Sequence, residues 1–308
     1  YKNRYIYVTL AGINDLSMAP KNSSEARDIK TSMAGWFSGS LELLAAQPVP
    51  GDEAIHDVRV LMKKHRAALK LVQHLLDDDV YRREYGAARE TGRLLASWRE
   101  SAVLRKTVRG LKKDNPELFV RLHGNERIQS LLRKPYSTWD EAGVQAKTAG
   151  EVSDRLRKAQ YRLRFLSLKE PDMRQLLTGF EESYAAAATA YLACRNRPVP
   201  KLLHEFRKKS KTFMYQLIFF RHLDQPAVKQ IEKKLNTMTQ NLGRYNDLAQ
   251  VMMLTEYRFG AAGNSDSDDG LAVVIKDRQD KYLQKVWPVA YRIFAPGRKL
   301  QDLLGISF

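Results

Sequence analysis

Apolar residues recur three and four positions apart along most of the chain, and strict alternation of apolar and polar residues is nearly absent. The first spacing is typical of amphipathic α-helices and the second of half-buried strands, so the pattern predicts an all-α protein. Prolines, glycines and polar runs separate the periodic segments. The helices predicted in this way cover residues 27–46, 52–76, 79–112, 140–168, 172–195, 199–223, 227–259 and 270–305.

The predicted helices are long, which favours antiparallel helical bundles over the crossed packing of a globin. Residues 113–139 are expected to be irregular with two short helices, and residues 263–270 (GNSDSDDG) to form a polar, flexible loop.

Two of these helices carry the same motif at an offset of 148 residues, since His56, Arg59 and Lys63 correspond to His204, Arg207 and Lys211. Each motif is followed by a second repeated segment, since LASWRESAV at 95–103 resembles LGRYNDLAQ at 242–250. We call this pair of segments the second echo of the repeat. Self-similarity at a fixed offset indicates a duplicated structural unit. We therefore predict an N-terminal extension at 1–26 and two helical-bundle repeats at 27–170 and 171–308, packed about a pseudo-twofold axis.

Cationic residues of the first motif fall on one side of their helix, separate from its apolar face. At 100° per residue, the stripe that they form is about 80° wide, and its members are His56, Arg59, Lys63, Arg66 and Lys70. Like charges three or four positions apart destabilise a helix, and few acids alternate with these cations. Because guanidinium groups can bind phosphate oxygens in bidentate fashion, the stripe favours an anion site over a merely solvated face.

The second motif repeats this stripe in a shorter form, with His204, Arg207, Lys211 and the flanking Lys208, after which Met214 and Ile218 replace cations. Both motif histidines are expected to become charged beside a bound anion, which would raise their pKa.

The net charge points in the same direction. The chain has 308 residues, with 52 Lys and Arg against 35 Asp and Glu, which gives a net charge of +17. Such a charge indicates an anionic partner: nucleic acid, a phosphate polymer or an acidic membrane. The single cysteine, Cys194, excludes an internal disulfide and a multi-cysteine metal site, and it favours a reducing compartment. No apolar run approaches the roughly 20 residues that a membrane-spanning helix needs.

Other candidate chemistry is sparse, and no catalytic residue, metal site or cofactor is predicted. No glycine-rich nucleotide loop, P-loop or H-E-x-x-H motif occurs. Asn246 and Asp247 could bind a cation or orient a basic neighbour, although a structural hydrogen bond or ion pair is the commoner role for such residues. The side chains expected in the core include His65, Trp98, Phe206, Phe213 and Tyr245.

Taken together, the two histidine motifs and the Leu-Gly-x-x-Asn-Asp-Leu element at 242–248 resemble the CHAD domain, the conserved-histidine α-helical domain. The resemblance covers about residues 29–305, with Arg99-Glu100 as the first-half counterpart of Asn246-Asp247, and with Thr212 and Met214 in place of two expected cations. It adds Lys64 to the predicted anion-binding residues, which become His56, Arg59, Lys63, Lys64, Arg66, Lys70, His204, Arg207, Lys208 and Lys211.

This resemblance implies two similar four-helix bundles around a basic central channel. It also implies binding of inorganic polyphosphate without catalysis, at polyphosphate granules in the cytoplasm. Two alternatives remain open at this point. A general nucleic-acid-binding protein explains the charge equally well, and an enzyme acting on phosphate anhydrides would need metal-binding carboxylates, which do not cluster beside the stripes.

Overall fold

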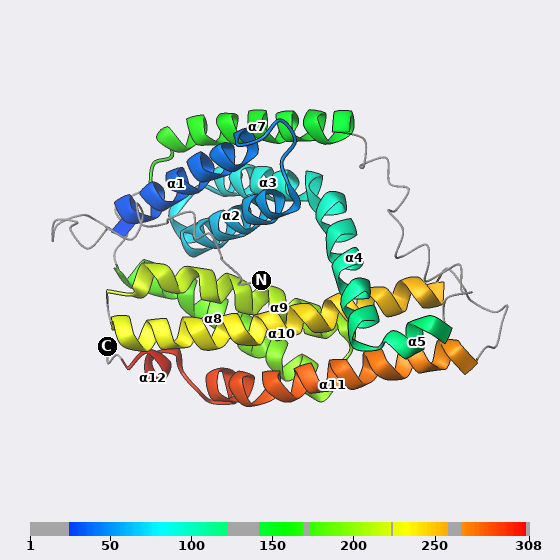
Figure 1. Cartoon of the computed structure of the whole chain (residues 1–308). Helices are drawn as coiled ribbons and strands as arrows, with labels where there is room; N and C mark the ends of the chain where they lie inside the picture. The colour runs from blue at the N-terminus through cyan, green and yellow to red at the C-terminus, as the bar shows by residue number, and fades with distance from the viewer. Residues whose placement is uncertain (1–24, 122–141, 169–172, 223, 258–265, 306–308) are drawn as a thin grey trace.

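The computed structural model describes residues 25–121, 142–168, 173–222, 224–257 and 266–305, and within them the all-α prediction is confirmed. Figure 1 shows the helices, which are α1 (Glu25–Ala45), α2 (Asp52–Leu71), α3 (Asp78–Leu94), α4 (Ala96–Asp114), α5 (Pro116–Arg121), α7 (Ala142–Arg164), α8 (Met173–Asn196), α9 (Pro200–Gln216), α10 (Gln225–Tyr257), α11 (Asp266–Phe294) and α12 (Leu300–Leu304). Two 3₁₀ turns, η3 (Gln73–Leu75) and η4 (Leu217–Phe220), extend α2 and α9.

The helices form two four-membered groups that each close on themselves. In the first group α1 packs on α2, α2 on α3, α3 on α7, and α7 on α1. In the second group α8 packs on α9, α9 on α10, α10 on α11, and α11 on α8. Figure 1 shows the first group above the second, with α4 descending from one to the other. The two groups agree with the two predicted bundles, while the pseudo-twofold axis, the central channel and the division at residue 170 stay predictions.

The two groups meet chiefly through α2, which packs against α8 and α9. The backbones approach very closely here, since a Cβ atom on Gly179 of α8 would lie 2.3 Å from the carbonyl oxygen of Leu71. A buried side-chain bond reinforces the contact, because Gln216 Nε2 donates to the carbonyl oxygen of Ala67 at 2.9 Å. The cationic stripes of α2 and α9 are therefore carried by two helices in direct contact.

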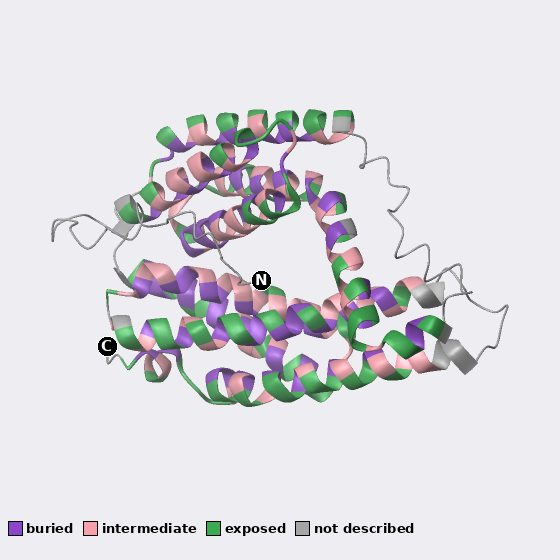
Figure 2. Cartoon of the chain, viewed as in Figure 1, coloured by how far each residue is buried: buried purple, intermediate pink, exposed green. Residues whose placement is uncertain are grey.

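Apolar faces account for this packing. In Figure 2 the buried positions of α7 face α1 and α3, and its exposed positions lie on the outer side. The predicted apolar face of α2 is buried, with Ile55 and Val58 both 0% exposed. All five predicted core side chains, including His65 at 2% exposed, are likewise buried.

Several predicted helix boundaries were wrong. The helix predicted at 79–112 is two helices, because the chain turns at Leu95, where α3 stays on the first group while α4 crosses to α10. The side chain of Leu95 is fully buried and anchors this turn. The helix predicted at 270–305 begins at Asp266, inside the predicted loop, and it ends at Phe294. A left-handed residue, Gly297 (φ 77°), breaks it before α12.

Three predictions fall on residues that the structure does not describe: most of the extension at 1–26, most of the irregular segment at 113–139, and the first part of the loop at 263–270. Within the segment predicted to be irregular, the structure describes residues 113–121, and these include the short helix α5. Across the part of the chain that the structure describes, no helix is long and apolar enough to cross a membrane.

Candidate anion-binding site

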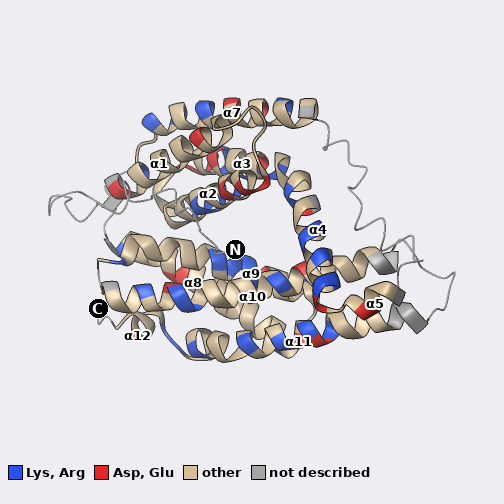
Figure 3. Ribbon diagram, in the orientation of Figure 1, with Lys and Arg blue, Asp and Glu red and all other residues tan. Residues whose placement is uncertain are grey.

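The two stripe-bearing helices start where local sequence favours a start. Helix α2 follows Pro50 and Gly51 and carries Asp52 and Glu53 in its first turn, where the helix dipole favours acidic side chains. Helix α9 starts at Pro200, whose missing N–H costs nothing at a first helical position. Figure 3 shows that α2, α9 and the neighbouring α4 all present Lys and Arg toward the centre of the molecule.

The equivalent arginines of the two motifs make equivalent contacts. A guanidinium N–H of Arg59 donates to the carbonyl oxygen of Gly92 on α3, and Arg207 Nε donates to the carbonyl oxygen of Thr239 on α10 at 3.1 Å. Gly92 and Thr239 each precede by three residues the leucine that opens the second echo of the repeat. Both arginines thereby connect the stripe to the following helix. The duplication seen in the sequence is thus also present at the level of single hydrogen bonds.

Lys63 and Lys211 lie at the centre of the site, one from each half of the molecule. Burial, followed by the nearby charges of Arg207, Arg59, Arg66 and Lys211, lowers the pKa of Lys63 to about 7. Burial also lowers the pKa of Lys211 to about 8, together with the charges of Arg207 and Lys64. The structure therefore brings the two predicted stripes into one cluster.

These central cations lack acidic partners. Among the residues that the structure describes, none of Arg59, Lys63, Arg207 and Lys211 forms an ion pair, whereas other partly buried cations of the chain do. Lys211 Nζ instead donates to the amide oxygen of Asn236 at 3.3 Å and lies over the ring of Tyr215. A group of cations that is partly desolvated and not neutralised stabilises a bound anion strongly.

Both motif histidines are uncharged in the free protein at neutral pH. The pKa of His56 is lowered to about 4 by the protein packed around its ring and by Arg99, Lys63 and Arg59. Burial and the charges of Lys208 and Arg207 also lower the pKa of His204, although the bond between its Nδ1 and Asn246 Oδ1, 3.2 Å long, opposes the change. The predicted positive charge on these rings therefore requires a bound anion.

The remaining predicted residues lie at the margins of the cluster. Lys64 lies near Arg221 and Glu232, and it lines a pocket that adjoins the cluster. Lys208 is exposed and paired with Glu205 at 2.8 Å. Lys70 lies near Lys209 and Glu182.

Arg66 extends the cluster on the α3 side. Its guanidinium lies over the ring of Tyr85, with 5.8 Å from Cζ to the ring centroid, and its buried Nε has no hydrogen-bond partner in the structure. A buried donor without a partner favours a ligand or a water molecule there.

Sequence reasoning missed Arg99 and left Asp247 open. Arg99 on α4 is close enough to lower the pKa of His56. Burial raises the pKa of Asp247, while the charges of Arg207 and Arg99, one from each half, oppose the rise. The signal for both residues was the second echo of the repeat, which aligns Arg99-Glu100 with Asn246-Asp247. Together with the contact of Asn246 to His204, these positions favour a structural role for the Asn-Asp pair.

The described residues contain no group of three or more His, Cys, Asp and Glu side chains that could hold a metal ion. What the Lys and Arg side chains of the site offer an anion is positive charge and several hydrogen-bond donors.

Comparison with known proteins agrees with this geometry. No curated protein matches the sequence. The family model of the CHAD domain matches residues 40–254, a region that contains α2, α9 and every predicted site residue. The chain belongs to the CHAD domain family.

Proposed function

We propose that the chain binds inorganic polyphosphate through the cation cluster between α2 and α9 and does not hydrolyse it. The family to which the chain belongs is associated with polyphosphate binding. The observation that carries the proposal is the pair Lys63 and Lys211, which come from different halves and have a lowered pKa without any carboxylate paired to them.

The contrast with other cations in the chain strengthens this interpretation. Elsewhere, partly buried arginines form ion pairs with carboxylates. Arg162 Nε bonds to Glu84 at 2.8 Å, and Arg221 Nη2 bonds to Glu232 at 2.8 Å. Asp247 and Glu100 act on Arg207 and Arg59 from nearby, but Lys63 and Lys211 have no carboxylate paired to them among the described residues. Like charges held together in this way destabilise a fold, so a purely structural role does not explain the cluster. A linear polyanion would supply the missing charges from outside the protein and release its own counterions on binding.

A competition experiment tests the proposal against the nucleic-acid alternative. Labelled long-chain polyphosphate is titrated onto the protein at several salt concentrations and challenged with duplex DNA at equal phosphate concentration. If about six to eight phosphates are neutralised, the slope of log affinity against log salt is expected to be about −4 to −6. Preference for polyphosphate at about physiological salt, near 0.15 M, supports a shaped site. Equal competition by DNA would make the cluster a general polyanion surface.

Two further measurements address the remaining parts of the proposal. Incubation with polyphosphate and magnesium is expected to release no phosphate, and release would show an enzyme.

A fluorescent fusion is expected to gather on polyphosphate granules in cells that form them. A fusion that stays diffuse there would separate binding from granule association.

A further inference from the structure

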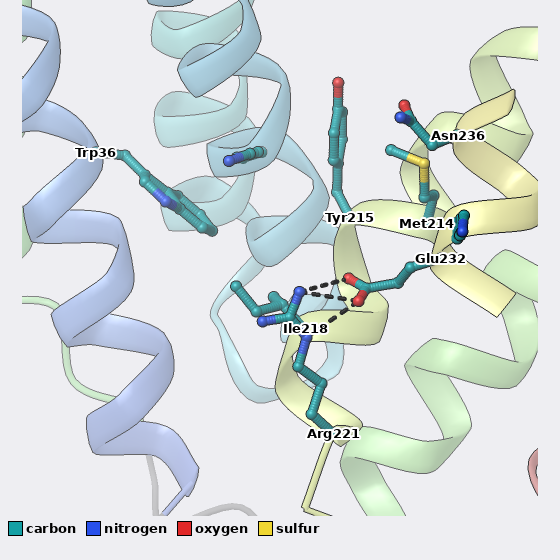
Figure 4. A pocket seen from close by; sticks show the side chains of 9 residues that line it. Trp36, Met214, Tyr215, Ile218, Arg221, Glu232 and Asn236 are labelled. Carbon is teal, nitrogen blue, oxygen red and sulfur yellow. Dashed lines mark hydrogen bonds and ion pairs between the residues drawn. The ribbon is translucent and has the colours of Figure 1, made fainter. Parts of the chain in front are cut away.

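A pocket opens beside the cation cluster, at the place where the two halves of the molecule meet. Its volume is about 290 Å³, and Figure 4 shows the side chains that line it. Trp36 comes from α1, Lys64 from α2, Met214 and Tyr215 from α9, and Glu232 from α10. Pockets of this size hold small organic molecules.

The lining of the pocket differs from the lining of the cation cluster. Met214 and Ile218, which stand where the second stripe loses its cations, both line the pocket, as do the rings of Trp36 and Tyr215. A linear inorganic phosphate chain has no group that benefits from these apolar and aromatic surfaces, whereas a planar aromatic ring does.

One carboxylate lies in the same pocket. Glu232 accepts three hydrogen bonds from Arg221, of 2.8 to 3.1 Å, and its side chain keeps 20% of its surface exposed. Lys64, Arg221 and Lys233 also line the pocket, so its charge does not exclude phosphate. The carboxylate can in addition accept a hydrogen bond from an amino group on an aromatic ring. The pocket thus favours a ligand with an uncharged, amino-bearing ring.

The pocket is continuous with the cluster. Asn236 lines the pocket and accepts the hydrogen bond from Lys211 Nζ. Lys64 lines the pocket as well, and its charge acts on Lys211. A ligand seated in the pocket can therefore extend a polyanionic tail from Lys64 toward Lys211 and the unpaired cations beyond it.

We propose that this pocket binds the base of a nucleoside polyphosphate whose phosphate chain lies on Lys64 and Lys211. The inference rests on the proposed function, because the phosphate tail uses cations of the polyphosphate site. It adds a second ligand class that combines an amino-bearing base with several phosphates.

The test compares ATP with inorganic tripolyphosphate, which has the same number of phosphates but no base. Both are titrated calorimetrically onto the full chain without divalent metal, and long-chain polyphosphate is titrated in parallel. Stacking of one base on aromatic side chains leads us to expect that ATP binds about tenfold more tightly. In saturation-transfer NMR, the base protons of ATP are expected to receive more saturation from the protein than its ribose 5′ protons.

Glu232→Gln removes the carboxylate from the pocket and is expected to lower the ratio of ATP affinity to tripolyphosphate affinity severalfold. Glu205→Gln is the matched control, since it also removes one acid and frees one cation, Lys208, but outside the pocket. That control is expected to raise both affinities and leave their ratio unchanged.

The outcomes separate the two proposals. If long-chain polyphosphate binds but ATP is no tighter than tripolyphosphate, or if the two glutamine variants change the ratio alike, the pocket does not bind a base and the polyphosphate site stands. If none of the three ligands binds, the proposed function itself is wrong.

Discussion

Lys63 and Lys211 are the residues on which the account depends most, because each is held near other cations and away from water. At pH 7 a pKa of about 7 leaves Lys63 only partly charged, whereas Lys211, with a pKa of about 8, loses its charge mainly above neutral pH. A bound polyanion favours the charged form and raises both values, so binding is accompanied by proton uptake.

We therefore predict that polyphosphate affinity rises as the pH falls. Between about pH 8.5 and about pH 6 the gain from the two lysines is expected to reach up to about 100-fold. Titration calorimetry in buffers of different ionisation enthalpy measures both the affinity and the protons taken up. Lys63→Met should remove most of the pH dependence, and a wild-type affinity that is flat across this range would contradict the assignment.

Gly243 is a second residue whose role can be tested singly. A Cβ atom there would lie 3.1 Å from Arg207 Nη2 and 3.2 Å from Nε, in the place where the guanidinium meets α10. Gly243→Ala is expected to displace the guanidinium from its bond to Thr239 and to weaken polyphosphate binding severalfold. The free energy of unfolding should change by less than about 1 kcal/mol, because alanine favours the helix by a similar amount.

Gly110→Ala on α4 is the control, since a Cβ atom there meets nothing within 4 Å. Calorimetry and thermal melts of both variants separate binding from stability. Equal affinity of the Gly243 variant and wild type would show that the position of Arg207 is not critical.

At the scale of elements, the packing of α8 on α2 decides how the two halves sit together. The carbonyl oxygen of Leu71 occupies the space that a side chain on Gly179 would need, and backbone cannot move aside as a flexible side chain can. We predict that Gly179→Ala lowers the free energy of unfolding by about 2 kcal/mol or more, as overpacking does.

Urea unfolding measures this change. Gly150→Ala on the outer helix α7 serves as the comparison, because that position is exposed and open and alanine should stabilise it by about 0.5–1 kcal/mol. If the Gly179 variant is as stable as wild type, the backbones of α8 and α2 can move apart to accommodate the added methyl group without loss of stability.

Helix content could be predicted from the sequence, but helix breaks could not be predicted equally well. Pro50 and Gly51 act locally, and they allowed the start of α2 to be predicted. Pro296 and Gly297 follow the end of α11, but the predicted helix ran through them to residue 305. The turn at Leu95 has no proline, and the segment 79–112 stays periodic through Gly92. It bends because α3 and α4 pack on different halves, and that cause is tertiary.

At the scale of the whole molecule, the repeat predicted a set of site residues but not how they assemble. Angular spacing on a single helix placed Lys63 on the stripe of the first motif and Lys211 on the stripe of the second. Only the contact between α2 and α9 brings them together and lowers the pKa of both lysines. Lys64 lines the pocket together with residues of α1, α9 and α10, and no sequence pattern indicated that pocket.

The account's central claim is that cations from both halves form one polyphosphate site. Its most direct test is the affinity for long-chain polyphosphate of the double variant Lys63→Met with Lys211→Met at about physiological salt, near 0.15 M. A hydrogen bond to a charged group contributes about 1.5–3 kcal/mol, so losing two should weaken binding about 100-fold or more.

The control is Lys158→Met with Lys229→Met, which removes two exposed charges from α7 and α10. The account predicts a small loss for this pair and a large loss for the central pair, with both proteins folded. Equal losses in the two double variants would contradict it, since binding would then follow the total charge of +17 rather than the cluster between the halves.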